Sequence, residues 1–118
     1  MGPAEEKSRR FARRIVRLYR YLCSERKEFV LSKQLLRSGT SIGANLAEAH
    51  YAFSRNDFLA KVYIALKETS ETIYWIDLLY DSNYLSARQY DSLMQDAQEL
   101  LKILTSSTKT IREQKDSE

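Results

Sequence analysis

Residues 35–85 decide the fold of this chain and read LLRSGTSIGANLAEAHYAFSRNDFLAKVYIALKETSETIYWIDLLYDSNYL. In the first half of this stretch, Gly39, Gly43 and Ala47 follow one another at intervals of four residues. On a helix this spacing places all three on one stripe, and a stripe without bulky side chains lets a second helix backbone approach closely. A ridge of larger apolar residues runs beside the stripe at helical spacing: Leu35, Ile42, Leu46 and Ala49.

The second half of the stretch predicts a long helix that begins after Ser54. Asp57 stands three residues after Ser54, which is the spacing of a capping box. Apolar and small residues then follow the helical period: Phe58, Val62, Ala65, Leu66, Thr69, Ile73, Ile76 and Tyr80. Further apolar side chains, among them Tyr63 and Tyr74, extend the apolar surface around the helix. One bundle core needs one apolar stripe per helix, so we expect a neighbouring subunit to cover the rest.

Four short segments of this stretch carry a family resemblance. SIGANLAEA (41–49), RNDFLAKVYIAL (55–66), SE (70–71) and NYL (83–85) resemble, in order and spacing, the signature of the 23S ribosomal RNA intervening-sequence proteins. That family is also called the four helix bundle proteins. The resemblance extends from the first predicted helix to Leu104. It implies an all-α, antiparallel, up-and-down four-helix bundle that assembles as a homo-oligomeric ring, usually a homopentamer. The family name reflects genes within ribosomal RNA intervening sequences, which is a genomic association.

Length and composition are typical of one helical domain. The chain has 118 residues, with one Pro and three Gly, which favours long helices. The single Cys23 has no partner for an internal disulfide, which indicates a reducing compartment. No apolar run reaches the roughly 20 residues that a membrane span needs, and the N-terminus shows no apolar signal core. We therefore expect a cytoplasmic location and no membrane partner.

The helical period predicts four helices in a single domain over residues 1–118. We expect them at residues 4–26, 32–52, 55–80 and 87–106, with a frayed polar tail at 107–118. The second helix contains weak helix formers such as Gly39 and Thr40, so two shorter helices broken near residues 38–40 are the alternative. The short links between helices imply antiparallel neighbours.

Two of these links carry specific predictions. Ser86 followed by Gln89 is a capping box for the fourth helix. In the first link, where the helical period breaks, we expect Phe29 and Val30 to plug the end of the bundle.

Charge is distributed unevenly along the chain. The net charge is +3, but residues 1–40 carry a net +7 and residues 41–118 a net −4, counting Lys and Arg against Asp and Glu. Such asymmetry indicates an anionic partner for the first helix or charge pairing between neighbouring subunits.

The first helix has a basic face that is the main candidate for function. Phe11, Ile15, Leu18, Tyr19 and Leu22 form its apolar stripe. The candidate nucleic-acid-binding residues occupy the other side: Arg10, Arg13, Arg14, Arg17 and Arg20. Guanidinium groups bind phosphates in bidentate fashion, so this face predicts contact with RNA or DNA. The alternatives are a solvated face that keeps the protein soluble and a surface that pairs with acidic residues of the fourth helix of a neighbour.

No pattern indicates catalysis, a cofactor or a metal. His50 is the only histidine, no Glu-x-x-His occurs, and the GTSIG segment (39–43) lacks the Lys of a phosphate-binding loop. We interpret His50 as a surface or bundle-end residue and Cys23 as a half-buried, inert thiol.

The small and aromatic residues of the middle helices predict a subunit interface. Tyr and Trp favour protein interfaces, where the ring is buried and the polar tip stays hydrogen-bonded. The candidate interface residues are Gly39, Gly43, Ala47, Tyr63 and Tyr74.

The leading functional hypothesis is a non-enzymatic, oligomeric binding or scaffold protein that associates with RNA through the basic face. A protein–protein adaptor without a nucleic-acid role is the alternative, and an enzyme ranks third.

Overall fold

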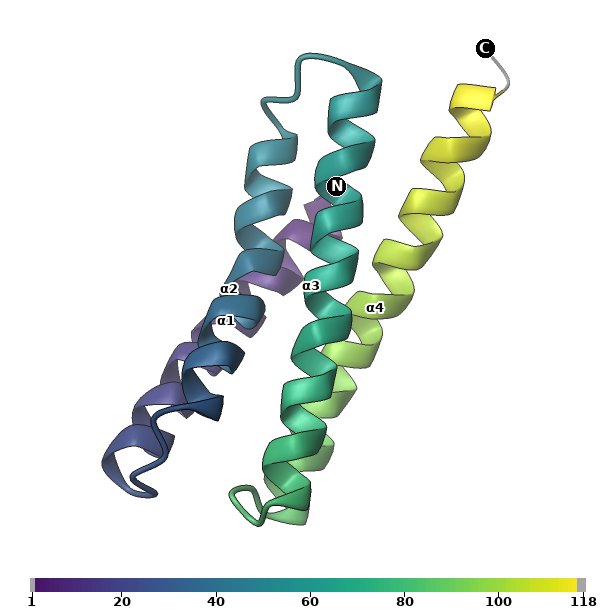
Figure 1. Cartoon of the computed structure of the whole chain (residues 1–118). Helices are drawn as coiled ribbons and strands as arrows, with labels where there is room; N and C mark the ends of the chain where they lie inside the picture. Colours follow the sequence, from purple (N-terminus) through teal and green to yellow (C-terminus); the bar gives the residue numbers. More distant parts are fainter. Residues whose placement is uncertain (1, 117–118) are drawn as a thin grey trace.

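The chain folds into four helices that run alternately up and down (Figure 1). The computed structural model describes residues 2–116, and no strand occurs among them. The helices are α1 (Gly2–Ser24), α2 (Leu31–Ala49), α3 (Arg55–Asp81) and α4 (Ala87–Asp116). The α2–α3 loop lies at one end of the bundle, and the two other loops lie at the opposite end (Figure 1). This arrangement is the predicted all-α four-helix fold.

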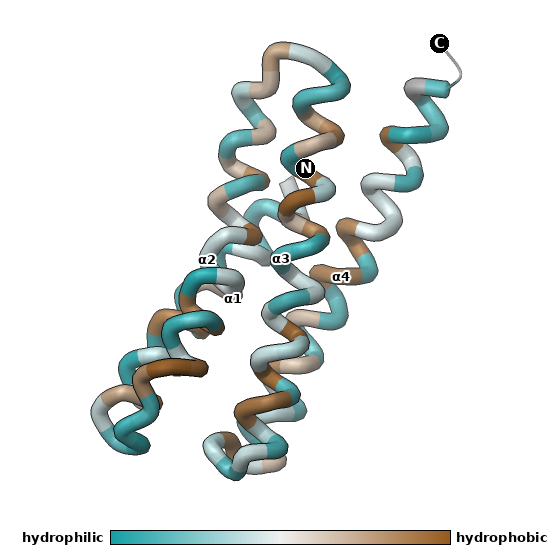
Figure 2. The backbone as a smooth tube through the Cα atoms, in the orientation of Figure 1, coloured by the Kyte–Doolittle hydropathy of each residue, from teal (hydrophilic) through white to brown (hydrophobic). Residues whose placement is uncertain are grey.

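The helices bury most of the apolar stripes that their periods predict, but Tyr80 of α3 is 37% exposed. Apolar residues alternate with polar ones along every helix (Figure 2). Phe11, Ile15, Leu18 and Leu22 of α1 are all buried. The largest fully buried apolar side chains of the other helices are Leu35, Ile42, Leu46, Val62, Ile76, Leu79, Leu100 and Leu104. The buried Ser and Thr hydroxyls inside the bundle are hydrogen-bonded, which offsets the cost of removing them from water. Thr72, for example, donates to Ser38 over 2.9 Å between α3 and α2.

The small-residue stripe lies where α2 packs against α1. Gly39 is buried, and a methyl group built on it would lie 2.9 Å from Cγ1 and from Cγ2 of Ile15. A methyl group on Gly43 would lie 3.2 Å from the hydroxyl oxygen of Ser8. The distances at Gly39 are far shorter than the roughly 3.5–4.0 Å of optimal packing between carbon atoms, and the contact at Gly43 is also tight, so the close approach of two helices is confirmed. The helix is continuous through both glycines.

The predicted caps are present at two helix starts. Ser86 and Gln89 bond reciprocally: the Gln89 N–H donates to the Ser86 hydroxyl, and the Ser86 N–H donates to the Gln89 side chain. The Ser54 hydroxyl accepts the Asp57 N–H at 3.0 Å. Both motifs satisfy N–H groups that the first turn of a helix leaves unpaired.

The first loop differs from the prediction. Phe29 and Val30 do not plug the bundle, because they are 58% and 74% exposed. The buried residue of this loop is Glu28, whose carboxylate accepts the N–H groups of Val30, Leu31 and Ser32 at 2.6–3.0 Å. A carboxylate at a helix N-terminus satisfies the free N–H groups and complements the helix dipole, so Glu28 caps the start of α2.

The expected frayed tail is wrong for residues 107–116, since α4 continues as a helix to Asp116. Thr108 is buried, and Ile111 packs against the core. The guanidinium of Arg112 lies 5.2 Å from the centre of the Tyr63 ring of α3. Because α3 is long, the end of α4 has a packing partner that the polar composition of this segment does not reveal. Residues 117 and 118 lie outside the described part.

Candidate nucleic-acid-binding groove

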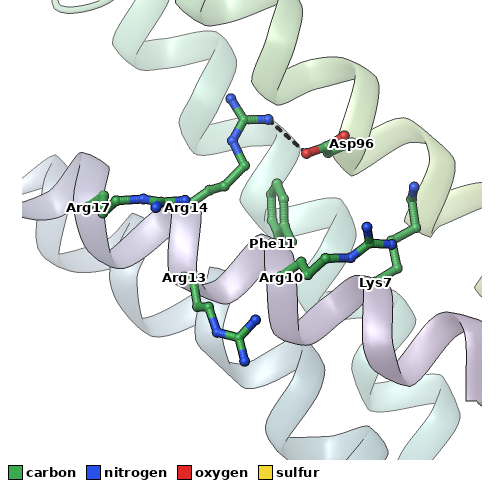
Figure 3. Close-up of a pocket in the computed structure, with 7 residues that line it drawn as sticks. All are labelled: Lys7, Arg10, Phe11, Arg13, Arg14, Arg17 and Asp96. Carbon is green, nitrogen blue, oxygen red and sulfur yellow. Dashed lines mark hydrogen bonds and ion pairs between the residues drawn. The ribbon is translucent and has the colours of Figure 1, made fainter.

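An open groove of about 460 Å³ runs along α1 at its contact with α4. Figure 3 shows the seven residues that line it: Lys7, Arg10, Phe11, Arg13, Arg14, Arg17 and Asp96. Phe11 is 1% exposed, so its ring belongs to the core beneath the groove. The rest of the lining comprises five cationic side chains and one carboxylate. The groove therefore concentrates positive charge between two helices.

Arg14 reaches across the groove and binds α4. Its guanidinium donates to Oδ2 of Asp96 at 2.7 Å, to the Ser92 carbonyl at 3.2 Å and to the Ser92 hydroxyl at 2.9 Å. Figure 3 shows Arg14 pointing to Asp96, while Arg13 points in another direction. One of the five predicted arginines therefore already has an anionic partner inside the chain.

Lys7 forms a second ion pair across the same helix contact, with Glu99 of α4. Lys7 and Arg14 thus pair with acidic residues of α4 in the same chain. The predicted alternative, in which the basic face pairs with the fourth helix of a neighbouring subunit, stays a prediction. Both pairs are partly exposed to solvent, so each contributes modestly to stability.

The other four predicted arginines are exposed: Arg10, Arg13, Arg17 and Arg20. None of them has an ion pair or a hydrogen bond within residues 2–116. Arg10 and Arg17 are seven residues apart on the groove side of α1, or about 10 Å along the helix axis. Arg17 also lines a second hollow of about 210 Å³ with Leu18, Gln89 and Leu93, so the hollow surface continues along the α1–α4 contact. Arg20 lines neither hollow.

These guanidiniums can bind phosphate oxygens, since each presents two parallel N–H donors that match a phosphate. No histidine or cysteine is among the described residues that line the groove. Over residues 2–116, no three His, Cys, Asp or Glu side chains gather in a way that could hold a metal ion. The arrangement of these guanidiniums therefore supports binding of an anion.

The two other residues whose side chains could take part in chemistry, His50 and Cys23, lie apart from the groove. His50 is exposed at the end of α2, with Nε2 2.6 Å from Oε1 of Glu5 on α1. Cys23 is half-buried, with its sulfur 3.9 Å from the Ser32 hydroxyl. A hydrogen bond of the Tyr19 hydroxyl to the Cys23 sulfur raises the pKa of Tyr19 above its ordinary value.

The predicted interface residues have different surroundings. Gly39 is covered by Ile15 of its own chain, which leaves it no surface for a second subunit. Gly43, Ala47 and Tyr63 are half-buried, and Tyr74 is 58% exposed and packs edge-on against Trp75. For these four residues the interface role stays a prediction.

Sequence reasoning missed two members of the groove, Lys7 and Asp96. Lys7 lies seven residues before Arg14, so helical spacing alone could have placed it on the same side of α1. Asp96 lies 82 residues from Arg14, and no local pattern connects the two. It is the acidic enrichment of the second part of the chain that hints at such a partner.

Two large aromatic side chains project from the α2–α3 loop. Tyr51 is 89% exposed and Phe53 is 90% exposed. Backbone hydrogen bonds from Tyr51 and Ala52 to the last turn of α2 fix the loop, so these rings lie on an ordered segment.

Residues 2–116 contain no helix with the length and apolarity that crossing a bilayer requires.

Comparison with known proteins gives one family and a close structural likeness. The family model described as 23S rRNA-intervening sequence protein matches residues 4–106. A crystal structure of a protein of unknown function from the S23 ribosomal protein family of Bacteroides thetaiotaomicron is 54% identical in sequence and superposes with a TM-score of 0.89. The match covers 90% of this chain and 98% of that one. A search of curated proteins found no match.

Proposed function

Because the chain belongs to the 23S rRNA-intervening sequence protein family, we propose that it is a non-enzymatic, oligomeric scaffold that binds RNA through the basic face of α1. The observation that supports this proposal is a set of exposed guanidiniums that have no partner within residues 2–116: Arg10, Arg13, Arg17 and Arg20. Uncompensated cations on one side of a helix attract the phosphate backbone and release its counterions.

Binding of this kind reads phosphates and not bases, so we expect little sequence preference. A homo-oligomeric ring, a pentamer by family resemblance, repeats the basic face around its axis. Repetition raises the avidity for a long polyanion without any new contact, because one bound site holds the strand close to the next.

The test is binding of a labelled single-stranded RNA by the variant Arg13→Glu/Arg17→Glu. Both side chains are exposed, so helicity should stay unchanged in circular dichroism. We expect affinity to fall at least about tenfold near 50 mM salt, and the wild-type salt dependence to have a log–log slope of about −0.7 per phosphate contact. The matched control is Lys33→Glu/Lys67→Glu, which changes the net charge equally at exposed positions of α2 and α3.

Two results would contradict the proposal. Absence of RNA and DNA binding by the wild type at low salt favours the adaptor function. Normal binding by Arg13→Glu/Arg17→Glu together with a smaller oligomer mass assigns the arginines to contacts between subunits.

The exposed rings Tyr51 and Phe53 favour the second candidate function, a protein–protein adaptor without a nucleic-acid role. Exposed aromatic side chains on an ordered loop are typical anchors of protein interfaces. If the protein is an adaptor, substitution of Tyr51 and Phe53 by Ser should abolish capture of a protein partner. If the protein binds RNA through α1, the same substitutions should leave RNA affinity unchanged.

A further inference from the structure

Asp96 is the one acidic side chain among the residues that line the groove (Figure 3). Its carboxylate accepts a hydrogen bond from Arg14, at the position that a phosphate oxygen would take on the same guanidinium. A carboxylate and a phosphate each offer a pair of acceptor oxygens to the guanidinium fork. They therefore compete for one site.

The Arg14–Asp96 pair is weak enough to exchange. The two side chains are 32% and 33% exposed, so water screens their attraction. Arg10 and Arg17, which line the same groove, have no anion of their own within the described residues. A phosphate at Arg14 would thus gain two further cationic neighbours that Asp96, on the opposite helix, does not reach.

The contact between α1 and α4 also permits the exchange. These two helices share much less contact than any other adjacent pair in the bundle. Arg14 is half-buried and lies above the groove, while the core beneath it is closed by Phe11. The guanidinium can therefore leave Asp96 without opening the core.

We propose that Asp96 is an internal competitor for the ligand, and that a phosphate of the bound nucleic acid displaces it from Arg14. This inference rests on the proposed RNA-binding function and concerns its regulation. It gives α4 a role in tuning affinity through a carboxylate that occupies Arg14 in the absence of ligand.

The test compares Asp96→Asn with Asp91→Asn in fluorescence anisotropy with a labelled single-stranded RNA of about 16 nucleotides. Both variants remove one negative charge from α4, but Asp91 is exposed and forms no hydrogen bond or ion pair with α1 within the described residues. Since exposed ion pairs are weak, we expect Asp96→Asn to raise affinity about two- to fivefold over Asp91→Asn near 50 mM salt. Adding Arg14→Gln to Asp96→Asn should remove this gain, and thermal melts of all variants verify the fold.

The outcomes separate the two proposals. Equal affinities of Asp96→Asn and Asp91→Asn, with clear wild-type binding, overturn the competitor role and leave RNA binding intact. The competitor role is also overturned if the gain in RNA affinity from Asp96→Asn persists when Arg14→Gln is present, because the gain then arises from overall charge. Weaker binding by Asp96→Asn also overturns it and makes Asp96 a positioning residue for Arg14. If neither the wild type nor Asp96→Asn binds RNA, both proposals fail.

Discussion

Replacement of Gly39 by Ala tests the close packing of α2 on α1. In an exposed helix this change stabilises the folded state by about 1 kcal/mol, because Gly has the greater conformational entropy in the unfolded chain. Here the added methyl group would lie 2.9 Å from both γ-carbons of Ile15 and 3.3 Å from its β-carbon. Something must therefore move before the methyl group fits.

Ile15 cannot yield easily. It is fully buried, and a β-branched side chain in a helix has essentially one allowed χ1 rotamer. The remaining response is a shift of the helix backbones, for which overpacking costs about 1–3 kcal/mol. Ala stabilises a helix by about 1 kcal/mol relative to Gly, which offsets part of the overpacking cost. We therefore expect Gly39→Ala to lower the free energy of unfolding by about 0–2 kcal/mol.

Gly43 supplies the matched control on the same helix. The methyl group of Gly43→Ala would lie 3.2 Å from a single atom, the hydroxyl oxygen of Ser8, and 3.7 Å from the next nearest. A small shift of this hydroxyl relieves the contact. We expect Gly43→Ala to be neutral or to stabilise the protein by up to about 1 kcal/mol.

The assay is urea unfolding followed by circular dichroism, at one protein concentration because oligomerisation changes apparent stability. Ile15→Ala removes both γ-carbons that the new methyl group would contact. In a double-mutant cycle, the destabilisation by Gly39→Ala should therefore disappear when Ile15→Ala is already present. Equal or greater stability of Gly39→Ala compared with Gly43→Ala would refute the packing argument.

Two further predictions follow from hydrogen bonds of carboxylates. The Tyr90 hydroxyl donates a hydrogen bond to Asp77 at 2.5 Å, which raises the pKa of Tyr90 to about 12. This hydrogen bond therefore stabilises the folded state below pH 10, the ordinary Tyr pKa, and the stabilisation is lost as the pH rises through about 12. Asp77→Asn should bring the pKa of Tyr90 back towards 10 in an ultraviolet titration, and an unchanged titration would contradict the hydrogen bond. Glu28→Gln removes the charge from the cap of α2 and should lower the free energy of unfolding by about 1–2 kcal/mol in urea, whereas the exposed Glu25→Gln should change it by less than about 0.5 kcal/mol.

The helices could be predicted from the sequence because their signals are local. The apolar period of α1 and the Ser86–Gln89 cap each act over a few residues, and the structure has both. The helical end of α4 escapes such a prediction because Ser and Thr are weak helix formers. Its helix depends on tertiary contacts, which override propensity, because Ile111 packs against the core and Arg112 lies over the Tyr63 ring of α3.

The candidate site was predictable on one helix only. Helical spacing placed the arginines on one side of α1, but it could not show which of them has a partner. Arg14 is bound by Asp96 and Ser92 of α4, far away in the chain. Likewise, hydrophobicity favoured Phe29 as the plug of the first loop, whereas the free N–H groups of α2 are satisfied by Glu28.

The sparse contact between α1 and α4 has a consequence for folding kinetics. The other three helix contacts join neighbours in the chain, and contacts of short sequence separation form fast. The α1–α4 contact joins the two ends of the chain, so its formation closes the longest loop and has the largest entropic cost. It also has the fewest interactions to offset that cost. It should therefore form after the transition state. Substitutions at Arg14 or Asp96 should then accelerate unfolding and leave the refolding rate unchanged, with φ-values near zero.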